Sequence, residues 1–156
     1  MAKRTVRRAR DGTFQLKLTD EERDLVASLT AQLRELLLSD QPDGVERLFP
    51  PGYANDEERQ TEYQLLTHDE LLQTRLAAID LVEQSVTSPV LTADEVNAWM
   101  AAVNSLRLVL GTRLDVPEDV FAAGFDPGAP DAYELAVYAF LTWLQEAAVE
   151  AASGAL

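Results

Sequence analysis

The sequence predicts a mainly α-helical protein, a bundle of about five helices that carries a β-hairpin at its N-terminus. Apolar residues recur at helical spacing through most of residues 19–156. A short basic segment precedes them, with alternating apolar residues on both sides of an Asp-Gly pair. At 156 residues the chain suits one compact domain with a buried core. We therefore interpret residues 1–156 as a single domain, with a basic hairpin at 4–18 and a helical body at 19–156.

The N-terminal hairpin allows two registers. A two-residue Asp-Gly loop would pair Arg7 with Leu16, whereas a three-residue loop with Gly12 as a left-handed bulge pairs Val6 with Leu16. We prefer the three-residue loop, because it keeps Val6 opposite an apolar partner and gives Gly12 a conformation that glycine adopts readily. The residues expected to dock on the helical body are Val6, Phe14, Leu16 and Leu18.

Three of the helices follow a capping box, in which a threonine hydroxyl and a glutamate carboxylate three residues later accept hydrogen bonds from each other's backbone N–H groups. The boxes are Thr19–Glu22, Thr67–Glu70 and Thr92–Glu95, and an amphipathic run follows each one. The predicted helices cover residues 20–38, 56–66, 68–87, 93–113 and 131–152. Alternatively, the second and third form one long helix that continues through Thr67.

The last predicted helix differs from the others, because between Leu135 and Leu144 only Thr142 is polar. A helix that is apolar on every side must bury most of its surface. We favour a central position in the bundle over a position half in the bundle and half in a partner. Separately, the aromatic residues that fall on apolar helical faces are expected in the core, namely Trp99, Trp143, Tyr133, Tyr138 and Phe140.

Charge is distributed unevenly along the chain. Residues 1–17 carry six basic residues and one acidic residue, a net charge of +5, which leaves 7 basic against 26 acidic residues and a net −19 for residues 18–156. A body of that sign repels nucleic-acid phosphates, so direct DNA binding is not expected outside the hairpin. The preferred interpretation is that the basic segment lies against its own acidic body.

The residues that usually carry enzyme chemistry are scarce. His68 is the only histidine, and the absence of cysteine excludes disulfides and thiolate metal sites. The sequence has neither a glycine-rich phosphate loop nor a nucleophile elbow. Asp80 and Glu83 are neighbouring acids that we interpret as part of a solvated acidic surface. We expect no enzyme activity, no cofactor and no metal site.

Two features bear on the compartment. No run approaches the roughly 18 apolar residues that a membrane-spanning helix needs. The basic N-terminus leads into Thr5-Val6-Arg7-Arg8 rather than into the apolar core of an export signal. The expected location is therefore the cytoplasm, with no membrane partner.

Two segments are candidates for binding a partner protein. The first is the hairpin, whose arginines can offer paired hydrogen bonds to carboxylates. The second is the loop around Pro50-Pro51, where two aromatic residues either form an exposed binding knob or pack on the core. The candidate partner-binding residues are Arg4, Arg7, Arg8, Arg10, Phe49 and Tyr53.

Several segments, taken in order, resemble a known family. They are Leu33-Arg34-Glu35-Leu36-Leu37, Arg47-Leu48-Phe49-Pro50-Pro51, Asp69-Glu70-Leu71-Leu72, Gly111-Thr112-Arg113-Leu114 and Leu141-Thr142-Trp143-Leu144-Gln145. This succession resembles the actinobacterial oxidative-stress regulator AosR family. The resemblance implies a small cytosolic regulator that acts through proteins of the transcription machinery and has no catalytic residues. Redox sensing through a disulfide is associated with that family, and this chain has no cysteine for it.

Two functions from different classes follow from these observations. The leading hypothesis is a non-enzymatic regulator or adaptor that acts by protein–protein interaction. The alternative is a nucleic-acid-binding regulator that uses the basic hairpin. The two differ in salt dependence, because neutralising several phosphates makes affinity fall steeply as salt is added.

Overall fold

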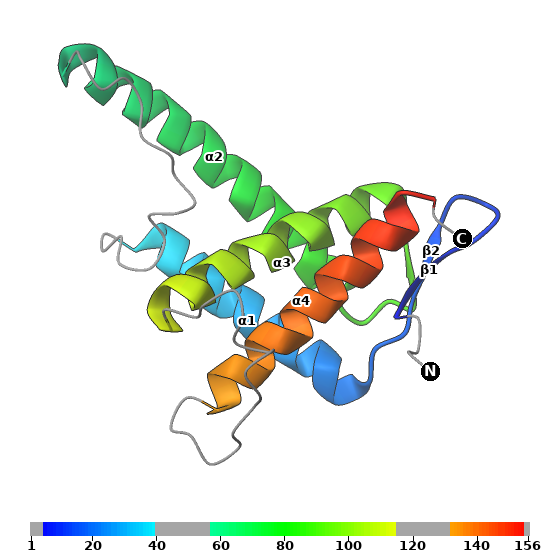
Figure 1. The fold of residues 1–156 in the computed structure, drawn as a ribbon. Helices are drawn as coiled ribbons and strands as arrows, with labels where there is room; N and C mark the ends of the chain where they lie inside the picture. The colour runs from blue at the N-terminus through cyan, green and yellow to red at the C-terminus, as the bar shows by residue number, and fades with distance from the viewer. Residues whose placement is uncertain (1–4, 40–56, 115–131, 155–156) are drawn as a thin grey trace.

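The computed structural model describes residues 5–39, 57–114 and 132–154. This part of the chain contains four helices and a small antiparallel sheet (Figure 1), which confirms the predicted mainly helical class. In chain order the elements are β1 (Val6–Arg8), β2 (Phe14–Leu16), α1 (Asp20–Leu38), α2 (Glu57–Ser85), β3 (Val90–Leu91), α3 (Ala93–Leu114) and α4 (Ala132–Ala152).

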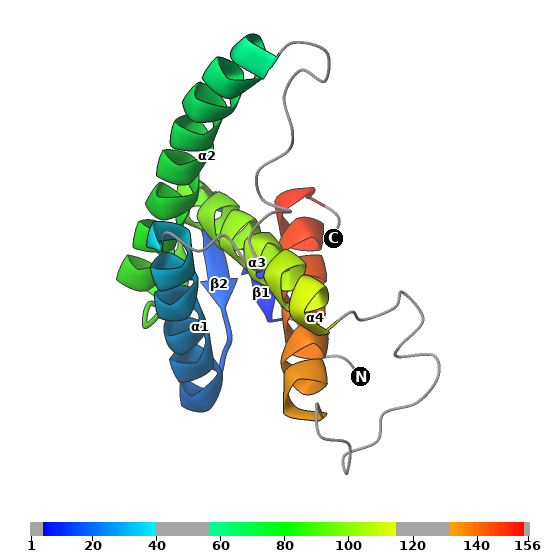
Figure 2. The ribbon, with the colours of Figure 1, turned by 90° about the vertical axis from the view of Figure 1, so that its left-hand side faces the viewer.

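Among the described helices, α1, α2 and α4 pack around α3. Figure 2 shows α3 between α2 and α4, with α1 beside α2, and the helices are in contact in this order. The sheet lies at one end of the bundle, where α4 contacts β1 and α3 contacts β3. The N-terminal part of α2 projects beyond the other described helices in both views. None of the described helices combines the length and the apolar character needed to cross a membrane.

Two of the three predicted capping boxes form. At the start of α1, the Thr19 N–H donates to Glu22 Oε1 at 2.8 Å and the Glu22 N–H donates to Thr19 Oγ1 at 3.1 Å. Thr92 and Glu95 make the same reciprocal pair before α3, at 2.8 and 3.1 Å. The predicted boundaries of α1 are confirmed, and α3 ends one residue later than expected.

The third box does not start a helix, because Thr67 lies inside α2. The prediction of separate helices at 56–66 and 68–87 is therefore wrong, and the single long helix is the structure adopted. No glycine or proline interrupts the sequence between Glu57 and Ser85, so nothing in the backbone forces a break there. A capping sequence acts as a cap only where the preceding chain leaves the helical conformation.

The hairpin forms in the preferred register. Val6 pairs with Leu16 and Arg8 with Phe14, and Gly12 has a φ of +88°. A third strand, β3, was not predicted: Val90 pairs with Gln15, and Leu91 with Phe14. A two-residue strand is too short to show an alternating pattern in the sequence.

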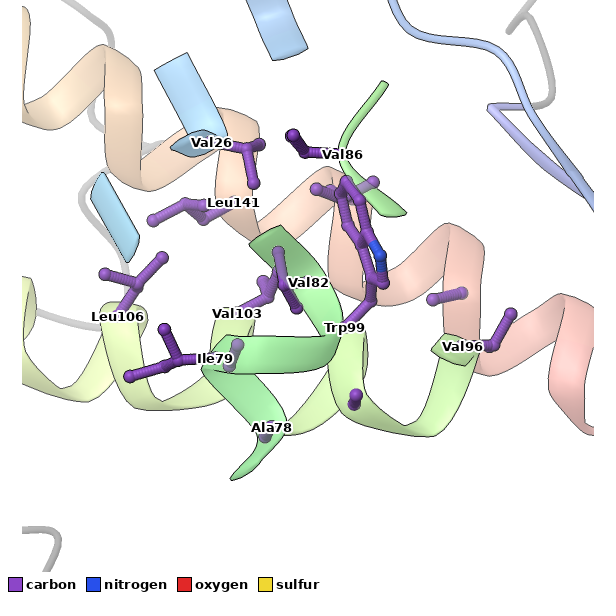
Figure 3. Packing of buried hydrophobic residues seen from close by; sticks show 14 of the residues in the cluster. Val26, Ala78, Ile79, Val82, Val86, Val96, Trp99, Val103, Leu106 and Leu141 are labelled. Carbon is purple, nitrogen blue, oxygen red and sulfur yellow. The ribbon is translucent and has the colours of Figure 1, made fainter. Parts of the chain in front are cut away.

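The core joins all four helices to the inner side of the sheet. Figure 3 shows Ile79, Val82, Val103 and Leu141 packed together with Trp99. Val6, Phe14 and Leu16 are buried as predicted, and Leu18 is half-buried against the same cluster. The hairpin therefore rests on the body through its apolar side chains.

The predicted central position of the last helix is wrong, because α3 occupies the centre and α4 packs at its side. Trp143 is 37% exposed on α4 and Val149 is 47% exposed. Several apolar residues of this helix are alanines, including the exposed Ala136. An exposed alanine leaves little apolar area in water, so an apolar sequence can occupy a peripheral position.

Candidate protein-binding surface

Three of the six candidate residues lie in the described part of the chain. Arg7, Arg8 and Arg10 are all exposed on the hairpin. Arg4, Phe49 and Tyr53 lie outside the described residues. In the described part of the chain, the candidate surface therefore comprises the hairpin and the elements that hold it.

Arg7 belongs to the solvent side of the sheet. It pairs with Gln15 on β2, and Gln15 pairs in turn with Val90 on β3, so the three side chains form one row across the sheet. Lys17 follows two residues after Gln15 and lies on the same side. All four side chains are exposed, Val90 at 46%. We call Arg7, Gln15, Lys17 and Val90 the outer sheet face.

Arg8 lies on the opposite side of the sheet, with the buried Val6 and Phe14. It is at the edge, where its side chain reaches the end of α4: a Cβ added at Gly154 would lie 3.1 Å from Arg8 Nη1. The carbonyl groups at a helix C-terminus carry partial negative charge, which favours a cation there. Arg7 and Arg8 are neighbours in sequence, but they face different surroundings.

Arg10 is exposed in the turn beside the only acidic residue of the hairpin, Asp11. The Thr13 hydroxyl and N–H donate to Asp11 Oδ1 at 2.6 and 3.0 Å. These hydrogen bonds, the hydroxyl bond first, hold the pKa of Asp11 below its ordinary value. The Asp11 carboxylate is thus engaged within the turn.

No ion pair within the described residues joins Arg7, Arg8, Arg10 or Lys17 to a carboxylate. We expected the basic segment to lie against acidic residues of its own body, but the described residues contain no such ion pair. The ion pairs present in the described residues hold α1 on α2 instead. They join Arg34 to the neighbouring acids Asp80 at 2.6 Å and Glu83 at 3.1 Å, and the hydrogen bond that Arg34 donates to the Asp80 carboxylate is the main cause that raises the pKa of Arg34.

Arg23 of α1 fixes the sheet in place, a role that the sequence analysis did not assign. Its Nη1 donates to the carbonyls of Val86 at 2.7 Å and Ser88 at 3.0 Å, and its Nη2 donates to the carbonyl of Leu16 at 2.9 Å. One guanidinium thus ties the first turn of α1 to the end of β2 and to the turn before β3. Two of the three partners are more than 60 residues away in sequence, so no local pattern reveals the contact.

A small apolar cavity lies on the inner side of the sheet, against α3 and α4. Gln145 is its single polar lining residue, and Val6, Leu91 and Trp99 are among the others. None of the hairpin cations lines this cavity. Within the described residues, no group of three His, Asp or Glu side chains is placed to hold a metal ion.

The fold and the surface define a small, mainly helical protein that carries a three-stranded sheet with a basic outer side. The chain belongs to the family described as Domain of unknown function (DUF2017), whose model matches residues 3–152. No curated protein and no solved structure matches the chain.

Proposed function

We propose that this protein is a non-enzymatic, cytoplasmic regulator or adaptor that acts by binding another protein. The family assignment carries no activity of its own. The resemblance to the AosR family supports a partner in the transcription machinery and a role in the transcriptional response to oxidative stress. Because the chain has no cysteine, a thiol-based redox sensor for this response would be a partner protein.

The observation that carries this proposal is the group of hairpin cations without carboxylate partners in the described residues. They stand on a sheet that Arg23 holds in one orientation, on a molecule whose remaining residues carry −19. Opposite potentials at two ends of a protein steer a charged partner into one orientation. Arginine also binds carboxylates through two parallel hydrogen bonds.

The test is affinity purification of the tagged chain from its native cell, followed by identification of the bound proteins. The variant Arg7→Glu with Arg8→Glu is expected to weaken partner capture by at least about 2 kcal/mol, a typical cost of losing an interface hot spot. Circular dichroism must show that the variant is folded, because Arg8 lies beside the end of α4. A folded variant that retrieves the same proteins as the wild type with equal efficiency would refute the proposal.

Nucleic-acid binding through the hairpin is the second candidate, and the same cations, which have no carboxylate partner among the described residues, favour it. The −19 body opposes it, because that charge repels phosphates within the screening distance of the solution. Anisotropy titration with labelled duplex DNA at physiological salt is expected to show weak or no binding. Nanomolar, sequence-selective binding, with affinity that falls steeply as salt is added, would replace the protein-binding proposal with this one.

A further inference from the structure

We infer that the docking surface is the outer sheet face rather than the hairpin as a whole, and that it takes an acidic segment of a partner protein with an apolar side chain for Val90. This inference rests on the proposed function and names the partner chemistry. It separates Arg7 and Lys17, which share the outer sheet face, from Arg8, which does not.

The geometry of the outer sheet face suits one short segment. Neighbouring strands lie about 5 Å apart, so the row from Arg7 through Gln15 to Val90 spans about 10 Å. Lys17 stands about 7 Å from Gln15 along β2. Two cations, an amide that both donates and accepts, and an exposed valine thus lie within reach of a few consecutive residues. Carboxylates match the cations, and an aliphatic side chain matches Val90.

Charge complementarity selects the acidic segment over a second copy of this chain. Placing two outer sheet faces together would bring Arg7 and Lys17 of each copy against like charges. Nucleic acid is also disfavoured, because two cations neutralise few phosphates while the acidic body repels the rest. An acidic protein segment escapes that penalty by placing only its short anionic stretch on the sheet.

The structure also favours recognition through side chains rather than addition of a strand at β3. The Ser88 hydroxyl donates to the Val90 carbonyl at 2.7 Å and accepts the Val90 N–H at 3.4 Å. These two backbone groups are therefore already engaged at the open edge of the sheet, where an added strand would need them. The partner segment must instead lie across the sheet.

The first experiment uses a defined probe, a fluorescein-labelled peptide of alternating Glu and Leu, in anisotropy titrations with the full chain. Arg7→Gln with Lys17→Gln is expected to weaken binding about tenfold, since each exposed ion pair contributes a few-fold. Two control variants are expected to bind within about twofold of the wild type. Arg8→Gln removes one cation from the other side of the sheet, and Gln73→Glu with Gln84→Glu makes the same net charge change on exposed positions of α2.

A second comparison tests the apolar contact. Val90→Ser is expected to weaken the Glu-Leu peptide about threefold and to leave a Glu-Ser peptide unchanged, because only the first offers an aliphatic partner. Equal loss for both peptides would contradict the assigned role of Val90. The inference is overturned if the wild type binds neither peptide, or if either control variant weakens binding as much as Arg7→Gln with Lys17→Gln. It is also overturned if duplex DNA displaces the labelled peptide at a lower concentration than the unlabelled peptide does.

Capture from the native cell separates failure of this inference from failure of the proposed function. If the Arg7→Glu, Arg8→Glu variant loses its partners while Arg7→Gln with Lys17→Gln keeps them, the inference fails and the proposed function stands. If both variants keep them, both fail. The inference is supported if both variants lose the partners, Arg8→Gln keeps them, and the partner segment that cross-links to the outer sheet face is acidic.

Discussion

Ser85 shows how one residue satisfies two buried polar groups. Its hydroxyl accepts the indole N–H of Trp99 at 2.9 Å and donates to the Leu81 carbonyl at 2.6 Å. Ser85 is 1% exposed and Trp99 is 2% exposed, so the hydrogen bond between them is buried. A buried tryptophan N–H usually has an acceptor, and Ser85 supplies it across the contact between α2 and α3.

We expect Ser85→Ala to lower the free energy of unfolding by about 1 to 3 kcal/mol, the usual cost of leaving a buried donor without an acceptor. Urea unfolding followed by tryptophan fluorescence measures the change. Ser28→Ala is the control, because Ser28 is exposed and its hydroxyl accepts from the exposed Gln32, and it should change stability by less than about 0.5 kcal/mol. Equal effects of the two substitutions would contradict the assigned role of Ser85.

Asp11 leads to a pH prediction at the hairpin turn. Hydrogen bonds from Thr13 hold its pKa below the ordinary 3.8. Because the folded-state pKa is the lower one, the contribution of Asp11 is complete above 3.8 and is lost as the pH falls through the folded value. The Thr13 amide resonance, followed by NMR during acid titration, should move with a midpoint below 3.8, and in Asp11→Ala this transition should be absent. A midpoint at or above 3.8 would rule the interaction out.

At the scale of secondary-structure elements, two of the three capping-box sequences begin a helix and the third does not. Thr19 and Thr92 cap helices through reciprocal hydrogen bonds with Glu22 and Glu95, whereas Thr67 lies in the interior of α2. The difference lies in the preceding chain. Thr19 and Thr92 follow strands, but Thr67 follows residues that are already helical.

We expect Thr19→Ala and Thr92→Ala each to cost about 1 kcal/mol of stability, the typical value of an N-cap side chain. Thr67→Ala should be neutral or stabilising by up to about 0.7 kcal/mol, because alanine has the higher helix propensity. Equilibrium denaturation of the three variants checks this order. If Thr67→Ala destabilised the protein as much as the other two, α2 would have to begin at Thr67 rather than at Glu57.

At the scale of the whole molecule, Arg23 connects the sheet to the helices. Its three carbonyl partners belong to the chain around the end of β2 and the turn before β3. The apolar contacts of Val6, Phe14 and Leu16 hold the sheet against the bundle. Arg23 adds directional bonds that define how the sheet sits on α1, and hence which way the outer sheet face points.

Arg23→Ala is expected to lower stability by about 2 to 4 kcal/mol, since three carbonyls lose charge-assisted hydrogen bonds. Arg23→Lys should recover only part of this loss, because one ammonium group cannot reproduce the fork of a guanidinium. Relative to the wild type, amide hydrogen exchange in both variants should accelerate more in β2 and β3 than in α3. Full recovery by lysine would mean that the charge alone matters.

The sequence by itself determined the features that depend on neighbouring residues. The register of the hairpin follows from Gly12 and from the alternation of Val6, Phe14 and Leu16. The start of α1 follows from Thr19 and Glu22, which lie within one helical turn of each other. Such interactions involve residues a few positions apart, so a sequence pattern contains both partners.

Only the tertiary structure decided the features whose partners are distant in the chain. The strand β3 exists because β2 provides hydrogen bonds for it, and α4 lies at the side because α3 fills the centre. Arg23 reaches carbonyls 63 and 65 residues away. For the candidate surface, the sequence supplied the arginines and, through the alternation of side chains along β1, their opposite sides of the sheet. Only the tertiary structure placed Arg8 beside the end of α4. Contacts of this kind form only when the chain folds back on itself, so a linear pattern does not record them.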